Sequence, residues 1–241
     1  MFYGLIIIMA LVSSLIFIFL RQPQFGQLPT GQRRLTIQHS SHYGNGEFQN
    51  QTPTPMLNDG KGFFSATWEY LFTKKERLRP QNGLPHFKTD LKKLDRERDV
   101  LIWLGHSSFY IQLGGRSILI DPVFSDYAAP VSFVNKSFPG TSPYSAADFP
   151  EIDYLLITHD HWDHLDYPTI MALPKIGRII TGLGTGAHFE RWGFSLDKIN
   201  EGDWGDIFKF DDLSIHLLPA RHFSGRALKR NQTLWTAFAI I

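Results

Sequence analysis

The pattern of hydrophobic and polar positions divides the chain into a long apolar run, a polar stretch and an alternating body. Residues 2–20 are predominantly apolar and carry no charge, and at a helical rise of about 1.5 Å per residue they reach across most of a ~30 Å hydrocarbon layer. Residues 22–62 are rich in Gln, Pro, Gly, Asn and Ser without a sustained apolar period, which predicts a linker. From residue 100 onwards, short apolar runs alternate with Gly, Pro and Asp, and this predicts layered α/β structure with helices outside the sheets.

Period-two alternation and short apolar runs define the elements expected in this body. The expected strands are residues 100–104, 109–113, 117–120, 154–157, 176–181, 207–210, 213–218 and 234–241, and the expected helices are residues 167–173 and 184–192. Gly114 and Gly115 favour a hairpin turn between the second and third strands. Residues 124–150 carry four prolines and no clean periodicity, which indicates a long loop. That loop either borders a cleft and selects substrate, or covers the sheet.

Residues 63–99 are expected to form an N-terminal extension that packs on or near the body. Residues 63–72 bring Phe, Trp and Tyr side chains together and predict a short helix with its aromatic face against the domain. The basic side chains that follow are Lys74, Lys75, Arg77 and Arg79. An alternative interpretation is an interfacial patch, with the aromatic rings at headgroup depth and the basic groups near anionic lipid.

The first 21 residues are interpreted as a single-pass membrane anchor. A cleaved signal peptide is the alternative, but no basic residue precedes the apolar run and no Ala-x-Ala site follows it. Arg21, Arg33 and Arg34 follow the run, so the positive-inside tendency favours a cytoplasmic body.

The densest chemical signal follows the apolar run at residues 154–157. His159, His161, Asp163 and His164 lie within six positions of one another, directly after a predicted buried strand. Residues two apart in an extended chain project to the same side, so the first two histidines can face one ion. Asp163 and His164 lie where the chain turns towards a helix, and they can hold a second ion. Imidazole and carboxylate suit zinc, iron or manganese, and a loop site leaves positions open for water.

The segment Thr158 to His164 resembles the His-x-His-x-Asp-His signature of the metallo-β-lactamase superfamily of binuclear metal hydrolases. Leu165-Asp166-Tyr167 is similar to the branch that contains N-acylphosphatidylethanolamine phospholipase D. That similarity extends to Trp103-Leu104-Gly105-His106, to Ile120-Asp121-Pro122-Val123-Phe124-Ser125 and to Leu234-Trp235. It therefore covers residues 100–241, and it implies a four-layer αββα sandwich over that range.

The resemblance also implies a role for individual residues. His222 stands where the family has the third histidine of its first metal, beside His159 and His161, while Asp163 and His164 would bind a second ion. Asp163 would also steer the attacking water. Two Zn²⁺ ions are expected, with Fe or Mn as possible substitutes.

Three further residues are candidates with weaker assignments. Asp121 is expected either to support a metal-binding imidazole from behind or to be an ordinary turn residue. His106 is expected either to face the metal cleft or to cap its turn. Arg221 is expected either to meet a phosphate or to be a surface charge.

Composition narrows the function. The chain has 241 residues, a net charge of +1 and no long basic run, so nucleic acid is not expected as a partner. It has no cysteine, which excludes disulfides and thiolate ligands.

The apolar run at residues 234–241 ends the chain without a cap, and we therefore expect a C-terminally truncated member of the family. The expected activity is hydrolysis of N-acyl phosphatidylethanolamine, or a related phospholipid of the bilayer, as a phosphodiester. The alternatives are a lactonase or sugar-phosphate hydrolase, or a non-catalytic metal-binding protein.

Overall fold

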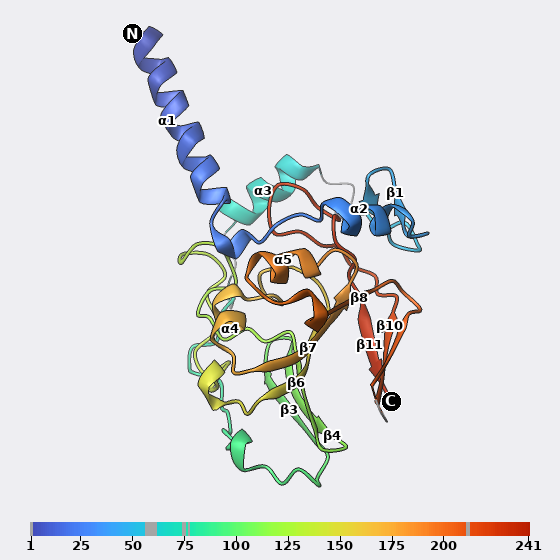
Figure 1. Ribbon diagram of the computed structural model, residues 1–241. Coiled ribbons are helices and arrows are strands. Elements are labelled where there is room, and N and C mark those ends of the chain that lie inside the picture. The colour runs from blue at the N-terminus through green and yellow to red at the C-terminus, as the bar shows by residue number, and fades with distance from the viewer. Residues whose placement is uncertain (1, 56–61, 74–75, 77, 211–212) are drawn as a thin grey trace.

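The larger of the two main sheets in the computed structural model has six strands in the order β3-β4-β5-β6-β7-β8 (Figure 1). Their bounds are β3 Val100–Gly105, β4 Ser108–Leu113, β5 Arg116–Ile120, β6 Ile152–Ile157, β7 Ile176–Gly182 and β8 Ile199–Gly202. The pairs β3/β4 and β4/β5 are antiparallel, whereas β5, β6, β7 and β8 run parallel. The structure describes residues 2–55, 62–73, 76, 78–210 and 213–241.

Strand β6 lies at the centre of the layered core because both of its faces are buried. Leu155 and Ile157 pack on one side with residues of the short helices α4 (Tyr167–Ala172) and α5 (Gly186–Arg191). Tyr154 and Leu156 point to the other side and pack against the second sheet. A continuous apolar run is typical of a parallel strand enclosed in this way.

The second sheet is antiparallel and has the order β11-β10-β9. Its bounds are β9 Ile207–Phe210, β10 Leu213–Leu218 and β11 Ala237–Ile240. Alternate residues of β10 are buried against the larger sheet, whereas Ile207 and Leu218 are exposed on the outer face. The described residues therefore form a helix layer and two sheet layers of the predicted four-layer α/β sandwich.

Most elements of the body agree with the sequence-based expectations, with two differences. Strand β8 was not expected, because Ile199-Asn-Glu-Gly has a single apolar residue and shows no periodicity. The last expected strand is shorter, because Leu234 and Trp235 lie in an irregular segment where both side chains are buried. Both differences arise from tertiary contacts that leave no periodic pattern in the sequence.

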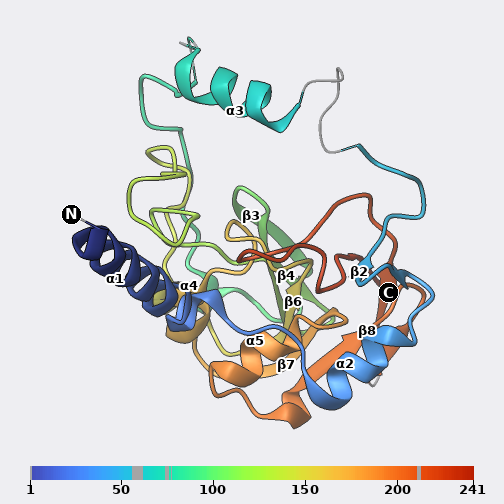
Figure 2. The same ribbon diagram turned by 90° about the horizontal axis from the view of Figure 1, so that it is seen from above.

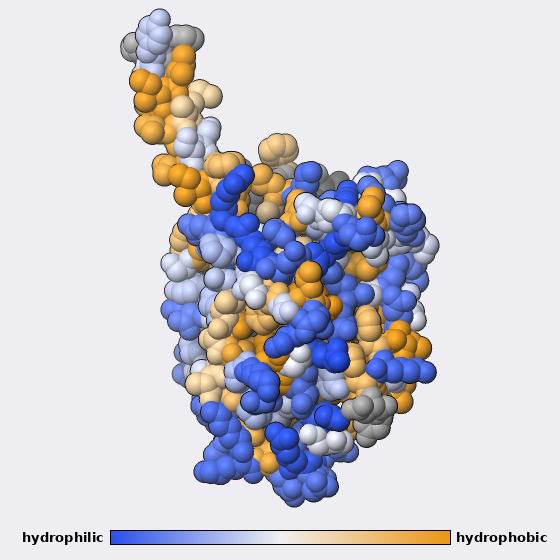
Figure 3. Space-filling view, in the orientation of Figure 1, coloured by the Kyte–Doolittle hydropathy of each residue, from blue (hydrophilic) through white to orange (hydrophobic). Residues whose placement is uncertain are grey.

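The N-terminal helix α1 (Phe2–Leu20) projects from the body and ends beside it (Figures 1 and 2). It is long and apolar enough to cross a membrane, and none of its 18-residue apolar window is buried. Figure 3 shows this apolar helix extending from a body whose visible face is largely hydrophilic. The feature agrees with a membrane anchor by length and composition.

The structure differs from the expected linker over much of residues 22–62. It places there a short 3-10 helix Pro23–Phe25, the helix α2 (Gly31–Gln38) and a hairpin of β1 (Tyr43–Gly44) and β2 (Glu47–Phe48). Ile37 and Phe48 are fully buried against Leu234 and Trp235. Single apolar side chains anchor this stretch to the body, which explains why composition alone indicated a linker.

The helix α3 (Phe63–Phe72) forms where it was expected, but the aromatic side chains that the structure describes on it, Phe64, Trp68 and Phe72, are exposed. Phe64 and Trp68 are 88% and 67% exposed, and Trp68 packs on the neighbouring exposed Phe72. Figure 2 shows α3 set apart from the two sheets. The expected basic residues Lys74, Lys75 and Arg77 lie outside the described residues.

Candidate metal centre

The site lies at the edge of the large sheet where the parallel strands end. Asp121 follows β5, and Thr158 and His159 follow β6, so parallel pairing brings them to the same edge. His222 comes from the segment after β10 of the second sheet. The backbone N–H of Thr236 donates to the Thr158 carbonyl at 2.9 Å, which ties the second sheet to the metal-binding loop.

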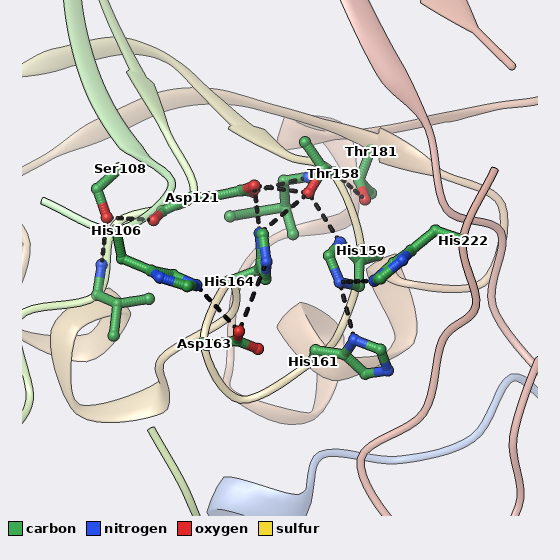
Figure 4. Close-up of polar contacts among 12 residues, drawn as sticks. His106, Ser108, Asp121, Thr158, His159, His161, Asp163, His164, Thr181 and His222 are labelled. Atoms are coloured by element: carbon green, nitrogen blue, oxygen red, sulfur yellow. Dashed lines mark hydrogen bonds and ion pairs between the residues drawn. The ribbon is translucent and has the colours of Figure 1, made fainter. Parts of the chain in front are cut away.

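Three histidine rings form the first donor group (Figure 4). The Nε2 atom of His159 lies 2.9 Å from Nδ1 of His161 and 3.1 Å from Nε2 of His222. Two nitrogens bound to one tetrahedral zinc ion, each about 2.0–2.1 Å from it, are about 3.4 Å apart. Small rotations of these rings therefore suffice to admit an ion.

The second donor group contains His106, Asp163 and His164, whose candidate ligand atoms all lie within 4.8 Å of one another. The Nε2 of His106 lies 3.0 Å from a carboxylate oxygen of Asp163, and the Nε2 of His164 lies 3.8 Å from the same oxygen. His106 reaches this position from a turn with a φ of +46°, a conformation that non-glycine residues adopt at a cost. The structure thus places the His106 ring beside Asp163 and His164 in the second donor group.

Asp121 supports from behind the loop that carries the candidate ligands. Its carboxylate accepts the backbone N–H of Thr158 at 2.8 Å and the Thr158 hydroxyl at 2.6 Å. The same carboxylate lies 2.8 Å from Nδ1 of His164. Because a carboxylate only accepts, Nδ1 of His164 carries the proton and Nε2 is left free to bind a metal.

Burial keeps the first group of imidazoles neutral, which is the form that binds a metal. Burial, with a smaller contribution from the neighbouring histidines, lowers the pKa of His159 to about 2. Burial also lowers the pKa of His161 and of His222.

The second group is arranged as an ion pair. The hydrogen bond to Asp163 raises the pKa of His106. Burial acts to raise the pKa of Asp163, but the bond to His106 and the charge of His164 outweigh it and lower that pKa. Asp163 is therefore held as a carboxylate, the form in which it can bind a cation.

A buried polar cluster behind the loop was not anticipated from the sequence. Asp160 and His188 are both buried, and Nε2 of His188 lies 3.1 Å from a carboxylate oxygen of Asp160. The guanidinium of Arg226, also buried, donates to the backbone carbonyls of Asp160 and Leu165 and lies 4.1 Å from the centre of the Trp162 ring. An available signal was Asp160 itself, a charged residue enclosed between two ligands.

A cavity of about 320 Å³ adjoins both donor groups. It is lined by His161, Trp162 and Asp163, and on other sides by Asn135, Phe223 and Arg230. The long loop at residues 124–150 therefore contributes to the cavity wall. Among the described residues, the lining includes Arg226 and Arg230 but not Arg221, whose Nε donates to the Thr54 hydroxyl instead.

The donor sets fit divalent transition metals. Three nitrogen donors in the first group, and two nitrogens with a carboxylate in the second, are typical ligands of zinc, iron or manganese. In the first group, ring nitrogens approach one another at hydrogen-bond distance, and a shared cation satisfies their lone pairs at once.

Comparisons with known proteins agree with this geometry. The family model described as "Beta-lactamase superfamily domain" matches residues 116–241. An uncharacterized protein of Mycobacterium tuberculosis is 36% identical over 211 residues, covering 86% of this chain and 56% of the relative. The N-acyl-phosphatidylethanolamine-hydrolyzing phospholipase D 1 of Caenorhabditis elegans is 31% identical over 150 residues, covering 58% of this chain and 42% of the relative.

A metal-dependent hydrolase of Anaeromyxobacter dehalogenans is 28% identical over 139 residues, covering 56% of this chain and 47% of the relative. The chain spans about half the length of the curated relatives it matches. The family match covers more than half of the chain and includes four of the clustered donors in one loop together with His222. The chain therefore belongs to the metallo-β-lactamase superfamily of metal-dependent hydrolases.

Proposed function

We propose that this chain carries the metal centre of a phosphodiesterase of phospholipase D type that acts on N-acyl phosphatidylethanolamine or a related phospholipid. The observation that carries the proposal is the position of the cavity at the base of the apolar helix α1. Trp162, which lines the cavity, packs edge-on against Phe25 at 5.2 Å. Phe25 in turn packs against Phe19 of α1 at 5.1 Å. A lipid held in the bilayer that α1 enters thus needs to move only a short distance to reach the donors.

The two donor groups divide the chemistry between them. His159, His161 and His222 would hold one ion and His106, Asp163 and His164 a second, and such ions would supply Lewis acids for a phosphoryl oxygen and lower the pKa of a water. Asp163 lies in the second group and faces the cavity, so its carboxylate is placed to orient this water and accept its proton. The water oxygen adds to phosphorus, the bond from phosphorus to the N-acylethanolamine oxygen breaks, and that oxygen takes the proton back from Asp163, so that phosphatidic acid and N-acylethanolamine are released.

His106 has two roles in this proposal. Its Nε2 can serve as the third donor to the second ion, and before metal binding it holds the Asp163 carboxylate in position. Its backbone has a φ of +46°, so the turn holds His106 in a conformation that non-glycine residues adopt at a cost.

The exposed rings of α3 support a bilayer partner. Phe64, Trp68 and Phe72 lie on a helix outside the core, and large exposed apolar groups of this kind are typical of interfacial segments. We propose that α3 rests at headgroup depth, since it lies on the same side of the body as α1 (Figure 1).

The test uses the full chain, loaded with Zn²⁺ and reconstituted in vesicles that contain N-acyl phosphatidylethanolamine. We expect release of N-acylethanolamine, and we expect His161→Ala to abolish it. His216→Ala is the matched control, because His216 lies on β10 and contacts Ser214 outside the donor groups. Hydrolysis that is unchanged in His161→Ala contradicts the proposal.

The substrates offered distinguish the alternatives. Turnover of lactones or sugar phosphates together with inert vesicles identifies another hydrolase of the superfamily. Tight binding of metal with no turnover of any of these substrates identifies a metal-binding role.

A further inference from the structure

Residues 21–27, which follow α1 directly, contact the body behind the loop of the candidate ligands, and Phe25 and Gly26 of this segment are buried. We name this segment the strap. Its backbone carbonyls are acceptors for three side chains from the body. Arg191 donates to Arg21 at 2.6 Å, and the indole N–H of Trp192 donates to Pro23 at 2.7 Å. Arg226 donates to the Gln24 carbonyl from both Nε and Nη2, at 3.2 and 2.8 Å.

Arg226 joins the strap to the loop that carries the ligands. While its Nε and Nη2 hold Gln24, its Nη1 donates to the carbonyl of Asp160, which lies between His159 and His161, and to the carbonyl of Leu165, which follows His164. Because Arg226 is only 5% exposed, a donor that loses its acceptor is poorly placed to bind water instead. Movement of the strap therefore removes partners from a group that fixes the backbone of the loop.

His188 makes a second connection between the same segments. The backbone N–H of Gln27 donates to Nδ1 of His188 at 3.2 Å, so this nitrogen carries no proton. The proton is on Nε2, which faces the Asp160 carboxylate at 3.1 Å. Asp160 also accepts the backbone N–H of Gly225 at 2.7 Å. The strap thus sets the tautomer of a buried imidazole that orients Asp160, the residue between two metal ligands.

At one position of the strap, the packing against His188 leaves room for no residue larger than glycine. Gly26 has a φ of +63°, and a Cβ at this position would lie 1.9 Å from Nδ1 of His188. A glycine is therefore required here both by the backbone conformation and by the approach of the ring.

We propose that the strap is a positioning element of the metal centre, with Arg226 and His188 as positioning residues, so that the segment leaving the apolar helix determines how tightly the loop binds metal. The strap and the loop are more than 130 residues apart in the sequence. Hydrogen bonds and ring contacts connect them, and none of these contacts involves an ion. The proposal depends on the metal centre but not on the substrate, because its test measures metal binding and not hydrolysis.

The experiment compares two glycine substitutions in the full chain in detergent micelles. Gly26→Ala displaces the strap, whereas Gly31→Ala is its matched control, because Gly31 also has a positive φ of +54° but has nothing within 4 Å of an added Cβ. We expect the Zn²⁺ dissociation constant of the first site, measured by chelator competition, to rise about 10- to 100-fold in Gly26→Ala, the range for partners that orient ligands. Gly31→Ala keeps the wild-type value.

Two further measurements separate positioning from general destabilisation. The visible absorption of bound Co²⁺ reports ligand geometry, and we expect it to change in Gly26→Ala but not in Gly31→Ala. Hydrogen exchange of the amides at residues 159–165 is expected to quicken only in Gly26→Ala. Trp192→Phe, which removes the bond to Pro23 and keeps a ring, is expected to act in the same direction with smaller size.

The result that overturns the proposal is a folded Gly26→Ala with the Zn²⁺ affinity and Co²⁺ spectrum of Gly31→Ala. Should Gly26→Ala not fold, Trp192→Phe decides: an unchanged affinity and an unchanged spectrum reject the positioning role.

Discussion

Replacement of Asp121 by asparagine is expected to weaken the second metal ion far more than the first. The carboxylate is 1% exposed and serves three groups, namely the N–H and the hydroxyl of Thr158 and Nδ1 of His164. In Asp121→Asn the remaining oxygen can still accept from the Thr158 N–H. The new amide nitrogen is a donor, so it cannot accept the proton of His164 Nδ1. The ring must then change tautomer, which removes the free Nε2 electron pair, or lose its orientation.

The effect on the second ion follows from the lost bond to His164. Removal of a partner that orients a metal ligand typically lowers affinity by about 10- to 100-fold, which corresponds to about 1.4–2.7 kcal/mol. His159 is less affected, because its Nδ1 contacts the Thr158 hydroxyl at 2.9 Å and that contact survives the substitution. The metal-free protein is expected to lose about 1–3 kcal/mol of its free energy of unfolding, since a buried bond is left unmatched.

Titration of the metal-free protein with Zn²⁺ against a chromophoric chelator measures both constants, and denaturant unfolding measures stability. Asp153→Asn is the matched control. Asp153 lies at the start of β6, at the end of the strands opposite the candidate metal centre, and accepts bonds from the N–H and the hydroxyl of Ser117 on β5. Two unchanged constants in Asp121→Asn, or an equal loss at both sites, would refute the proposed division of labour around Asp121.

Three further outcomes are expected. His106→Ala should lower the zinc content from about two ions per chain towards one, measured by elemental analysis after dialysis, because it removes a donor of the second group; a content that stays at two contradicts this. Leu155→Ala should cost about 2–5 kcal/mol in denaturant unfolding, since Leu155 is fully buried between β6 and the helices, and a loss below about 1 kcal/mol would show that the core can collapse around the site. Burial lowers the pKa of His188 in spite of its bond to Asp160, so the unfolded chain binds more protons than the folded chain as the pH falls below 6.5. Metal-free stability should therefore decline from pH 7 to pH 5, and His188→Gln should show a shallower decline; parallel curves for the two proteins count against this assignment.

The sequence by itself determined the centre of the fold and the identity of the principal donors. Leu155 and Ile157 belong to an unbroken apolar run that specifies an enclosed parallel strand, and the polar residues that follow must emerge at its end. His159 and His161 needed only the two-residue period of an extended chain to be predicted on one side. The apolar run and the two-residue spacing of the histidines involve neighbouring residues only, so both can be recognised from the sequence.

The partners of these donors were decided by tertiary structure. His222 reaches the first group from another sheet, and His106 joins Asp163 across 57 positions. Asp121 could be assigned either to a turn or to the loop until the parallel pairing of β5 and β6 brought it beneath Thr158. Sequence periodicity does not predict these contacts between distant residues, because they depend on how the strands pair and the two sheets pack.

The N-terminal segment shows most clearly the difference between what the sequence predicts and what tertiary contacts determine. Its composition predicted the apolar helix, which depends on a run of side chains, but indicated a free linker after it. The structure instead packs Ile37 and Phe48 into the core and directs the Gln24 carbonyl to Arg226. One buried side chain or one carbonyl is sufficient to fix a segment when its partner is already enclosed, and a partner about 200 residues away is visible only once the chain has folded.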